Sequence, residues 1–178
     1  MLFRSWSSGS AEAGALSKAE LERVYRIGVE CCKGRVPVYG NPPERQTVTA
    51  AAAHIRLAID CGVEAVNVYG PPGWHAFRPT DAEYSAFFDA LLPRIDHPVL
   101  LSPNPDMGYT PRPALVSDIV RRHRNIVGLN LNNHKGDGYF IALRERMERP
   151  LDINVSMAGS LPALLLGASG IEIGRAHV

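Results

Sequence analysis

The chain of 178 residues has almost no excess of charge of either sign, no long apolar run and few cysteines. Its formal net charge is only +1, which gives no indication of a nucleic-acid or membrane partner. No apolar run approaches the roughly 18 residues of a transmembrane helix, and the first residues lack the apolar stretch of a signal peptide. Cys31, Cys32 and Cys61 are odd in number and lack metal-ligand spacing. We therefore expect a cytoplasmic protein in which these cysteines are small core residues.

Two nucleotide-binding motifs are also absent. No G-x-G-x-x-G follows a predicted strand and the chain has no G-x-x-x-x-G-K, which disfavours a dinucleotide-binding fold and a P-loop. A metal site needs converging histidines or carboxylates, and the only weak candidates are Asp106, Asp137 and His134. We predict neither a cofactor nor a metal site.

What the sequence does have is a regular alternation of short apolar runs and amphipathic segments. Residues 125–130 (NIVGLN) are typical of a buried strand, and they follow the amphipathic segment 113–124, which is typical of a helix. Ser17 and Thr80 each begin an S/T-x-x-E capping box, a signal for the start of a helix. The predicted strand cores begin at Val36, Val63, Val99, Ile126, Ile153 and Ile171. Strict alternation of strand and helix predicts a parallel sheet that is covered by helices.

This pattern favours an α/β fold of the TIM (β/α)8 barrel type, with residues 1–172 as one partial barrel domain. A complete barrel has eight strands and typically about 250 residues, so we expect the chain to be truncated at both ends. Residues 2–6 supply most of one further strand. Residues 173–178 break the pattern and match one reading frame of a common sequencing-library adapter, which predicts a non-native tail. The alternative is a genuine charged terminus.

Four segments occur in an order that is shared with a known family: residues 9–12, 34–40, 98–105 and 125–129. On these segments the chain resembles the dihydrodipicolinate synthase / N-acetylneuraminate lyase family of class I aldolase barrels. The resemblance implies a lyase or aldolase that acts on a small 2-oxo acid or sugar acid and needs no added cofactor. It also implies a homo-oligomer when the protein is full length.

In that family the sixth strand ends in a lysine that forms a Schiff base with the substrate, and the matching residue here is Asn130. Burial lowers the pKa of a lysine and frees its lone pair for attack on a carbonyl. An amide nitrogen is not nucleophilic, so Asn130 cannot form the adduct. The chain has only three lysines, Lys18, Lys33 and Lys135. Lys135 follows Asn130 in the next loop and is either a displaced catalytic amine or a solvated loop charge.

The other family positions also depart from the pattern. The family's relay tyrosine is matched by Ser102, and a serine hydroxyl is too weak an acid to replace a phenol unaided. Tyr109, seven residues later in the chain, is either a packing residue or a relocated relay. The family's carboxylate-binding loop is matched by Ser8, Gly9 and Ser10. The two serines retain the hydroxyls, but Ala11 stands where the family has a second glycine. Further substrate-binding candidates at the barrel mouth are Tyr69, Asn104 and Ser156.

Two functional hypotheses follow from these departures. The first is a family enzyme whose Schiff-base chemistry has been lost or rebuilt around Asn130, Ser102 and Lys135. The second is a non-catalytic paralogue that binds a small ligand or regulates a catalytic homologue. A pyruvate-dependent imine would favour an enzyme that uses Lys135, and ligand binding without turnover would favour the paralogue.

Overall fold

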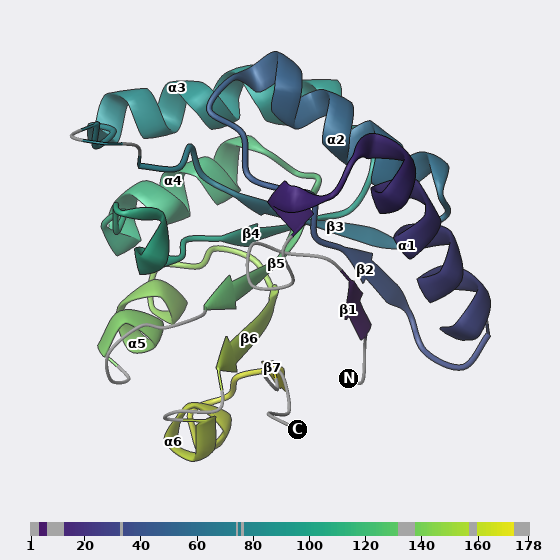
Figure 1. Cartoon of the computed structure of the whole chain (residues 1–178). Helices are drawn as coiled ribbons and strands as arrows, with labels where there is room; N and C mark the ends of the chain where they lie inside the picture. The colour runs from purple at the N-terminus through teal and green to yellow at the C-terminus, as the bar shows by residue number, and fades with distance from the viewer. Residues whose placement is uncertain are drawn as a thin grey trace.

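The fold is a parallel sheet of seven strands in the order β1 to β7, so that each strand pairs with its neighbours in the sequence. The computed structural model describes residues 4–6, 13–32, 34–73, 75, 77–131, 138–156 and 160–172. The strands are β1 (Arg4–Trp6), β2 (Val38–Gly40), β3 (Ala65–Tyr69), β4 (Val99–Ser102), β5 (Ile126–Leu131), β6 (Asp152–Ser156) and β7 (Gly170–Glu172). Figure 1 shows that the sheet curls and that the helices lie on its outer side.

Each of the six links between successive strands contains one α-helix. The helices are α1 (Lys18–Cys32), α2 (Val48–Asp60), α3 (Asp81–Leu91), α4 (Pro113–Arg122), α5 (Gly138–Arg144) and α6 (Ser160–Leu165). The short 3-10 turns are η2 (Ala13–Ala15), η3 (Leu92–Arg94) and η4 (Pro105–Met107). At the start of α3, Thr80 and Glu83 each accept a hydrogen bond from the other's backbone N–H, which forms the predicted capping box.

The hydrophobic core lies between the outer face of the sheet and the helices. Alternate strand residues such as Val66, Leu101 and Leu129 belong to it, and they pack with helix residues such as Phe88 and Ile119. Because successive side chains of a strand point to opposite faces, the residues between them face the inside of the curl. Several of these inner residues are polar and buried: Asn67, Ser102, Asn130 and Asn154.

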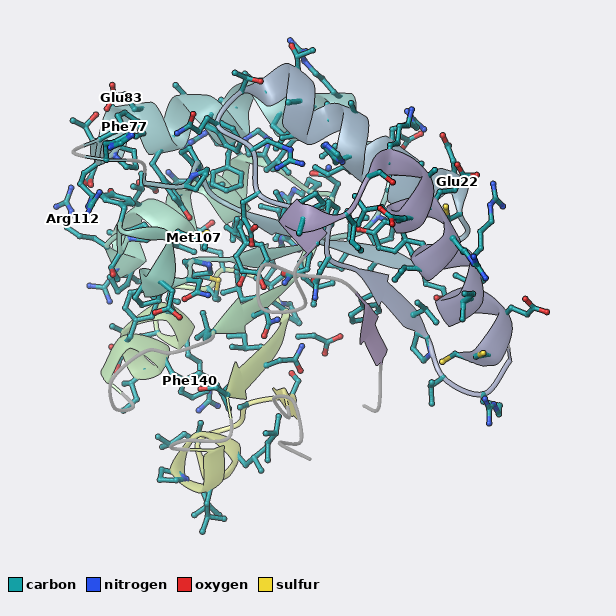
Figure 2. All side chains as sticks on the ribbon, in the orientation of Figure 1. Glu22, Phe77, Glu83, Met107, Arg112 and Phe140 are labelled. Carbon is teal, nitrogen blue, oxygen red and sulfur yellow. The ribbon has the colours of Figure 1, made fainter. Side chains whose placement is uncertain are left out.

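The side chains confirm this division of the molecule into core and periphery. Phe140 of α5 is buried in the core, whereas the side chains of Glu22 and Arg112 are 41% and 77% exposed and lie at the outer edge in Figure 2. No described helix is both long enough and apolar enough to cross a lipid bilayer.

The strands and helices lie where the alternating pattern predicts them, including a strand within residues 2–6. Among the described residues, β1 and β7 each pair with a single neighbour, so the sheet is an open, curled part of a barrel. This architecture agrees with a truncated TIM barrel. The tail at 173–178 lies outside the described residues.

The interpretation of all three cysteines as core residues is wrong for one of them. Cys32 and Cys61 are buried, but Cys31 is exposed. The buried side of α1 consists of Leu21, Tyr25, Gly28 and Cys32. Each helical residue turns the chain by about 100°, which carries Cys31 off that side although its neighbour lies on it.

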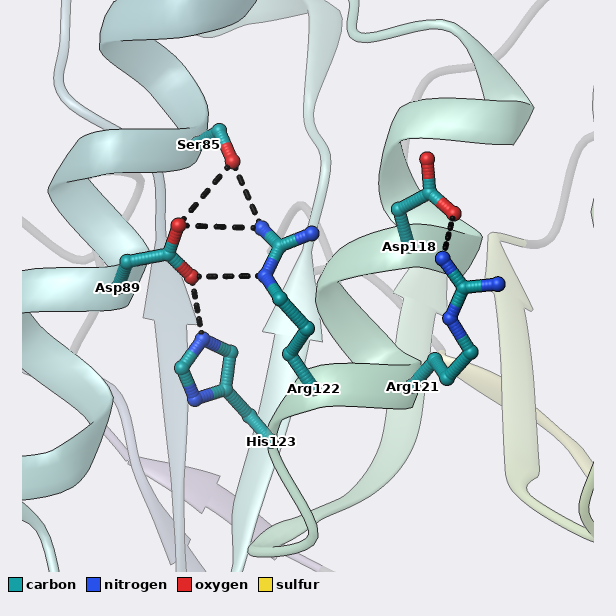
Figure 3. Close-up of polar contacts among 6 residues, drawn as sticks. All are labelled: Ser85, Asp89, Asp118, Arg121, Arg122 and His123. Atoms are coloured by element: carbon teal, nitrogen blue, oxygen red, sulfur yellow. Dashed lines mark hydrogen bonds and ion pairs between the residues drawn. The ribbon is translucent and has the colours of Figure 1, made fainter.

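A polar cluster joins α3 to α4 on the outside of the molecule (Figure 3). Asp89 accepts hydrogen bonds from Arg122 Nε at 3.0 Å and contacts His123 Nε2 at 2.7 Å. Arg122 Nη2 also donates to Ser85 Oγ at 2.7 Å. Burial raises the pKa of the Asp89 carboxyl, but the hydrogen bonds from His123 and Arg122 more than offset this, and its pKa lies below the ordinary value.

The first prediction concerns the packing of β5 against β6. A Cβ added at Gly128 would lie 2.6 Å from the Asp152 carbonyl oxygen, a backbone atom that cannot move without shifting β6. We expect Gly128→Ala to lower the free energy of unfolding by about 1–3 kcal/mol, measured by urea denaturation. The control is Gly138→Ala, where a Cβ would meet nothing within 4 Å. Equal effects of the two substitutions would contradict the proposed clash.

The second prediction concerns the pH dependence of the α3–α4 cluster. Because the pKa of Asp89 is lower in the folded state, its stabilisation is present above the unfolded value of about 3.9 and is lost as the pH falls through the folded value. We expect Asp89→Asn to lower the free energy of unfolding by up to about 1 kcal/mol near neutral pH, since the pair is partly exposed.

This difference between wild type and Asp89→Asn should shrink below about pH 3.9, as followed by urea denaturation at several pH values. Asp118→Asn is the matched control, because Asp118 pairs with Arg121 on the same helix at 2.7 Å and both side chains are about half exposed. A loss that is independent of pH would contradict an electrostatic role for Asp89.

Candidate functional site

Four inner-face residues lie side by side across the sheet. Tyr69 of β3 pairs in register with Ser102 of β4, and Asn130 of β5 pairs with Asn154 of β6. Leu101 pairs with Leu129, which brings the next residues, Ser102 and Asn130, level with each other. Paired residues of a sheet point to the same face, so these four form one row, here called the inner row (Tyr69, Ser102, Asn130 and Asn154).

The inner row lies toward the carboxyl ends of the strands. Tyr69 and Ser102 are the last residues of β3 and β4, and Asn130 is the last but one of β5. In barrels of this architecture the catalytic residues lie at that end. The position of the row therefore makes it the candidate site.

Burial and hydrogen bonding distinguish the inner row from an ordinary polar surface. Ser102 is 0% exposed and Asn130 is 2% exposed. The Ser102 hydroxyl donates to the Asn130 carbonyl oxygen at 3.0 Å, which ties the ends of β4 and β5 together. The hydroxyl is therefore already engaged with the backbone.

Two of the inner-face amides are incompletely satisfied. In the described part of the chain, Asn130 Oδ1 and both amide atoms of Asn67, which lies two residues before Tyr69 on the same face, have no hydrogen-bond partner. A buried polar atom left in this state costs about 1–3 kcal/mol. Such atoms are rare in native proteins, and a water or a ligand group beside them would satisfy them.

The remaining predicted site residues are not all brought together. Asn104 lies in the loop after β4, where its Oδ1 accepts from the Asp106 N–H at 3.0 Å and caps η4, so it has a local structural role. Ser156 is the last residue of β6, two positions beyond Asn154 on the same face. Ser8, Gly9, Ser10 and Lys135 lie outside the described residues, as does His134 of the weak metal candidates.

The tyrosine that was a candidate relay is engaged elsewhere. The Tyr109 hydroxyl donates to Asp81 at the start of α3, and its ring centroid lies 5.1 Å from that of Tyr84. Burial and the hydrogen bond to Asp81 raise the pKa of Tyr109 to about 12. A phenol with this pKa, paired with a carboxylate, is a poor proton relay at neutral pH, which favours the packing role.

Asn154 is the member of the inner row that the sequence analysis missed. The signal was present in β6, because apolar Ile153 and Val155 alternate with polar Asp152, Asn154 and Ser156. Alternation of this kind predicts one apolar and one polar face. Only the register to β5 shows that Asn154 lies level with Asn130.

Two other chemistries find little support among the described residues. They contain no group of three or more histidines, cysteines or carboxylates that is placed to hold a metal ion. Ser85, Asp89 and His123 have the residue types of a nucleophile triad, but they lie in the outer helix layer. The serine there contacts Asp89 and Arg122 rather than the imidazole, so the histidine does not activate it as a nucleophile.

No protein-family model matches the chain. A curated relative, the 4-hydroxy-tetrahydrodipicolinate synthase of Novosphingobium aromaticivorans, is 31% identical over 122 residues, which are 67% of this chain and 40% of the relative. A crystal structure of a dihydrodipicolinate synthase from Bacillus anthracis matches with a TM-score of 0.83 at 22% identity, over 95% of this chain and 56% of that one.

Two further solved structures carry small molecules. An E. coli K12 prophage protein of the dihydrodipicolinic acid synthase family, solved in complex with pyruvate, matches with a TM-score of 0.84 at 19% identity, over 96% of this chain and 57% of that one. A Clostridium difficile protein, solved in complex with mannosamine, matches with a TM-score of 0.81 at 16% identity over the same shares. The chain thus spans about half the length of the proteins it matches. The solved structures are all below 25% identical to this chain, so these matches show that it shares the fold of the dihydrodipicolinate synthase structures.

Proposed function

We propose that this chain carries part of the ligand site of a family barrel in which no Schiff base forms at position 130. The ligand is a small 2-oxo acid or sugar acid, held by hydrogen bonds from inner-face amides. The observation that carries this proposal is the placement of Asn130, whose side chain lies buried on the inner face of β5, level with Ser102.

The chemistry of the inner row supports the loss of the imine. The nitrogen of an amide shares its lone pair with the carbonyl and does not attack a ketone, whereas imine formation needs a free amine. Lys18 is the one lysine that the structure describes, and it is exposed at the start of α1. An imine would therefore need Lys135 or Lys33, which lie outside the described residues.

An amide row can still bind such ligands. Asn130 and Asn67 offer unpaired acceptors, and Asn67 also offers an unpaired donor. Amides of this kind fix hydroxyl, carbonyl and carboxylate groups through hydrogen bonds and provide specificity in small-molecule sites. The matched proteins solved with pyruvate and with mannosamine hold ligands of this size.

A specific observation favours the second candidate function, a non-catalytic binding or regulatory paralogue. The four residues of the inner row have amide, hydroxyl and phenol side chains, none of which exchanges a proton readily near neutral pH. An enzyme working on the same ligand would need an acid or base from outside this row.

Cytoplasmic location and assembly into a homo-oligomer remain predictions from the sequence.

The third prediction tests whether position 130 is the imine position. In Asn130→Lys, the new amine would lie at a site that is 2% exposed in the wild type, and desolvation would lower its pKa and make it nucleophilic. After incubation with pyruvate and borohydride, we expect one reduced adduct in this variant, mapped to position 130 by peptide mass spectrometry. The wild type should remain unmodified. Arg23→Lys is the matched control, because it places a solvent-exposed lysine on α1 and should also remain unmodified.

Two outcomes would contradict the proposal. An adduct on Lys135 in the wild type would show that the Schiff base has moved rather than been lost. A folded Asn130→Lys variant, with wild-type circular dichroism and no adduct, would show that position 130 does not face the ligand. Binding of pyruvate without turnover by the wild type would support the paralogue over the enzyme.

A further inference from the structure

A polar pocket lies at the opposite end of the strands from the inner row. It has a volume of about 90 Å³ and is formed by α4 and the link between α5 and β6, including Ser117, Arg121, Arg124, Glu148 and Arg149. Arg124 lies two residues before β5 and Arg149 lies three residues before β6. This pocket therefore lies at the amino ends of the strands, whereas the inner row lies toward their carboxyl ends.

Arg149 lines this pocket and is hydrogen-bonded to three backbone carbonyl oxygens. Its Nη2 donates to the carbonyl oxygens of Val120, His123 and Ile126, at 3.3, 3.3 and 2.5 Å. These bonds satisfy carbonyl oxygens at the end of α4 and the start of β5, so Arg149 has a structural role. They leave Arg149 Nε buried, with no hydrogen-bond partner in the described part of the chain.

The pocket carries more positive charge than its acidic neighbours balance. The side chain of Arg124 is exposed and forms no ion pair or hydrogen bond with any other described residue. Arg121 pairs with Asp118 at 2.7 Å, as Figure 3 shows, and only loosely with Glu148 at 3.7 Å. Burial and the nearby Arg124 charge lower the pKa of Arg149. Three guanidinium groups thus line the pocket with one carboxylate.

We infer that this pocket binds a small oxyanion of the phosphate class, either inorganic phosphate or the phosphate group of a phosphomonoester. Guanidinium groups match the geometry of tetrahedral oxyanions through paired N–H donors. One water needs roughly 10–15 Å³, so the pocket has room for a group of several heavy atoms. An anion there would pair with the exposed Arg124 guanidinium and relieve the repulsion between Arg124 and Arg149. This site is independent of the proposed function at the inner row.

The fourth prediction concerns phosphate binding, measured by isothermal titration calorimetry of the whole chain with inorganic phosphate and with glycerol phosphate. Ionic strength is held constant with sodium chloride. We expect saturable binding to the wild type and a loss of at least about tenfold in affinity in Arg124→Gln, as removal of one charge-assisted hydrogen bond implies. Glu148→Gln should bind more tightly, because it removes the one carboxylate that lines the pocket. Arg23→Gln, on α1, is the matched control and should bind as the wild type does.

Tight binding of either titrant supports the site. Tighter binding of inorganic phosphate would identify free phosphate as the ligand, and tighter binding of glycerol phosphate would identify a phosphomonoester. Three results would overturn it. The first is no binding by the wild type, and the second is equal loss in Arg124→Gln and Arg23→Gln, which would indicate a general ionic effect. The third is binding of acetate at the same affinity, which would replace the phosphate class by carboxylates. Arg149 is left unchanged in every variant, so that its backbone contacts continue to hold α4 against β5.

Discussion

The structure depends on a single constraint, the alternation of side chains along strands that are covered by helices on one side only. The residues facing the helices must be apolar, and Val66, Leu101 and Leu129 are. Their neighbours face the inside of the curl and are released from that requirement. The parallel register then places these inner residues level with one another, which assembles Ser102, Asn130 and Asn154 from three separate segments of the chain.

Much of the fold could be predicted because its signals are local. The capping box at Thr80 and the apolar run before Asn130 each depend on residues a few positions apart, and both lie where they were expected. The candidate site was only partly predictable. The place of Asn154 in the inner row depends on the register between β5 and β6. The capping role of Asn104 depends on the geometry of the loop after β4. The contacts of Arg149 with carbonyls more than twenty residues away carry no local signal at all.

The consequence of an asparagine at position 130, where the family has a lysine, depends on where this residue lies in the fold. On the outer face it would be a defect in the core, and in a loop it would be one polar residue among many. On the inner face of β5 it occupies a buried position next to Ser102, where an unpaired amide oxygen costs stability. The same sheet places an arginine-lined pocket at the other end of its strands. The sheet therefore carries the neutral inner row at one end of its strands and the cationic pocket at the other.

A crystal structure of the chain soaked with pyruvate tests most directly whether the inner-face amides hold a small ligand without a covalent bond to position 130. We expect an intact ligand within hydrogen-bond distance of the amide of Asn130 or Asn67, with no density joining it to a lysine. A covalent link between pyruvate and Lys135 or Lys33, or a ligand bound away from the inner face, would contradict this expectation.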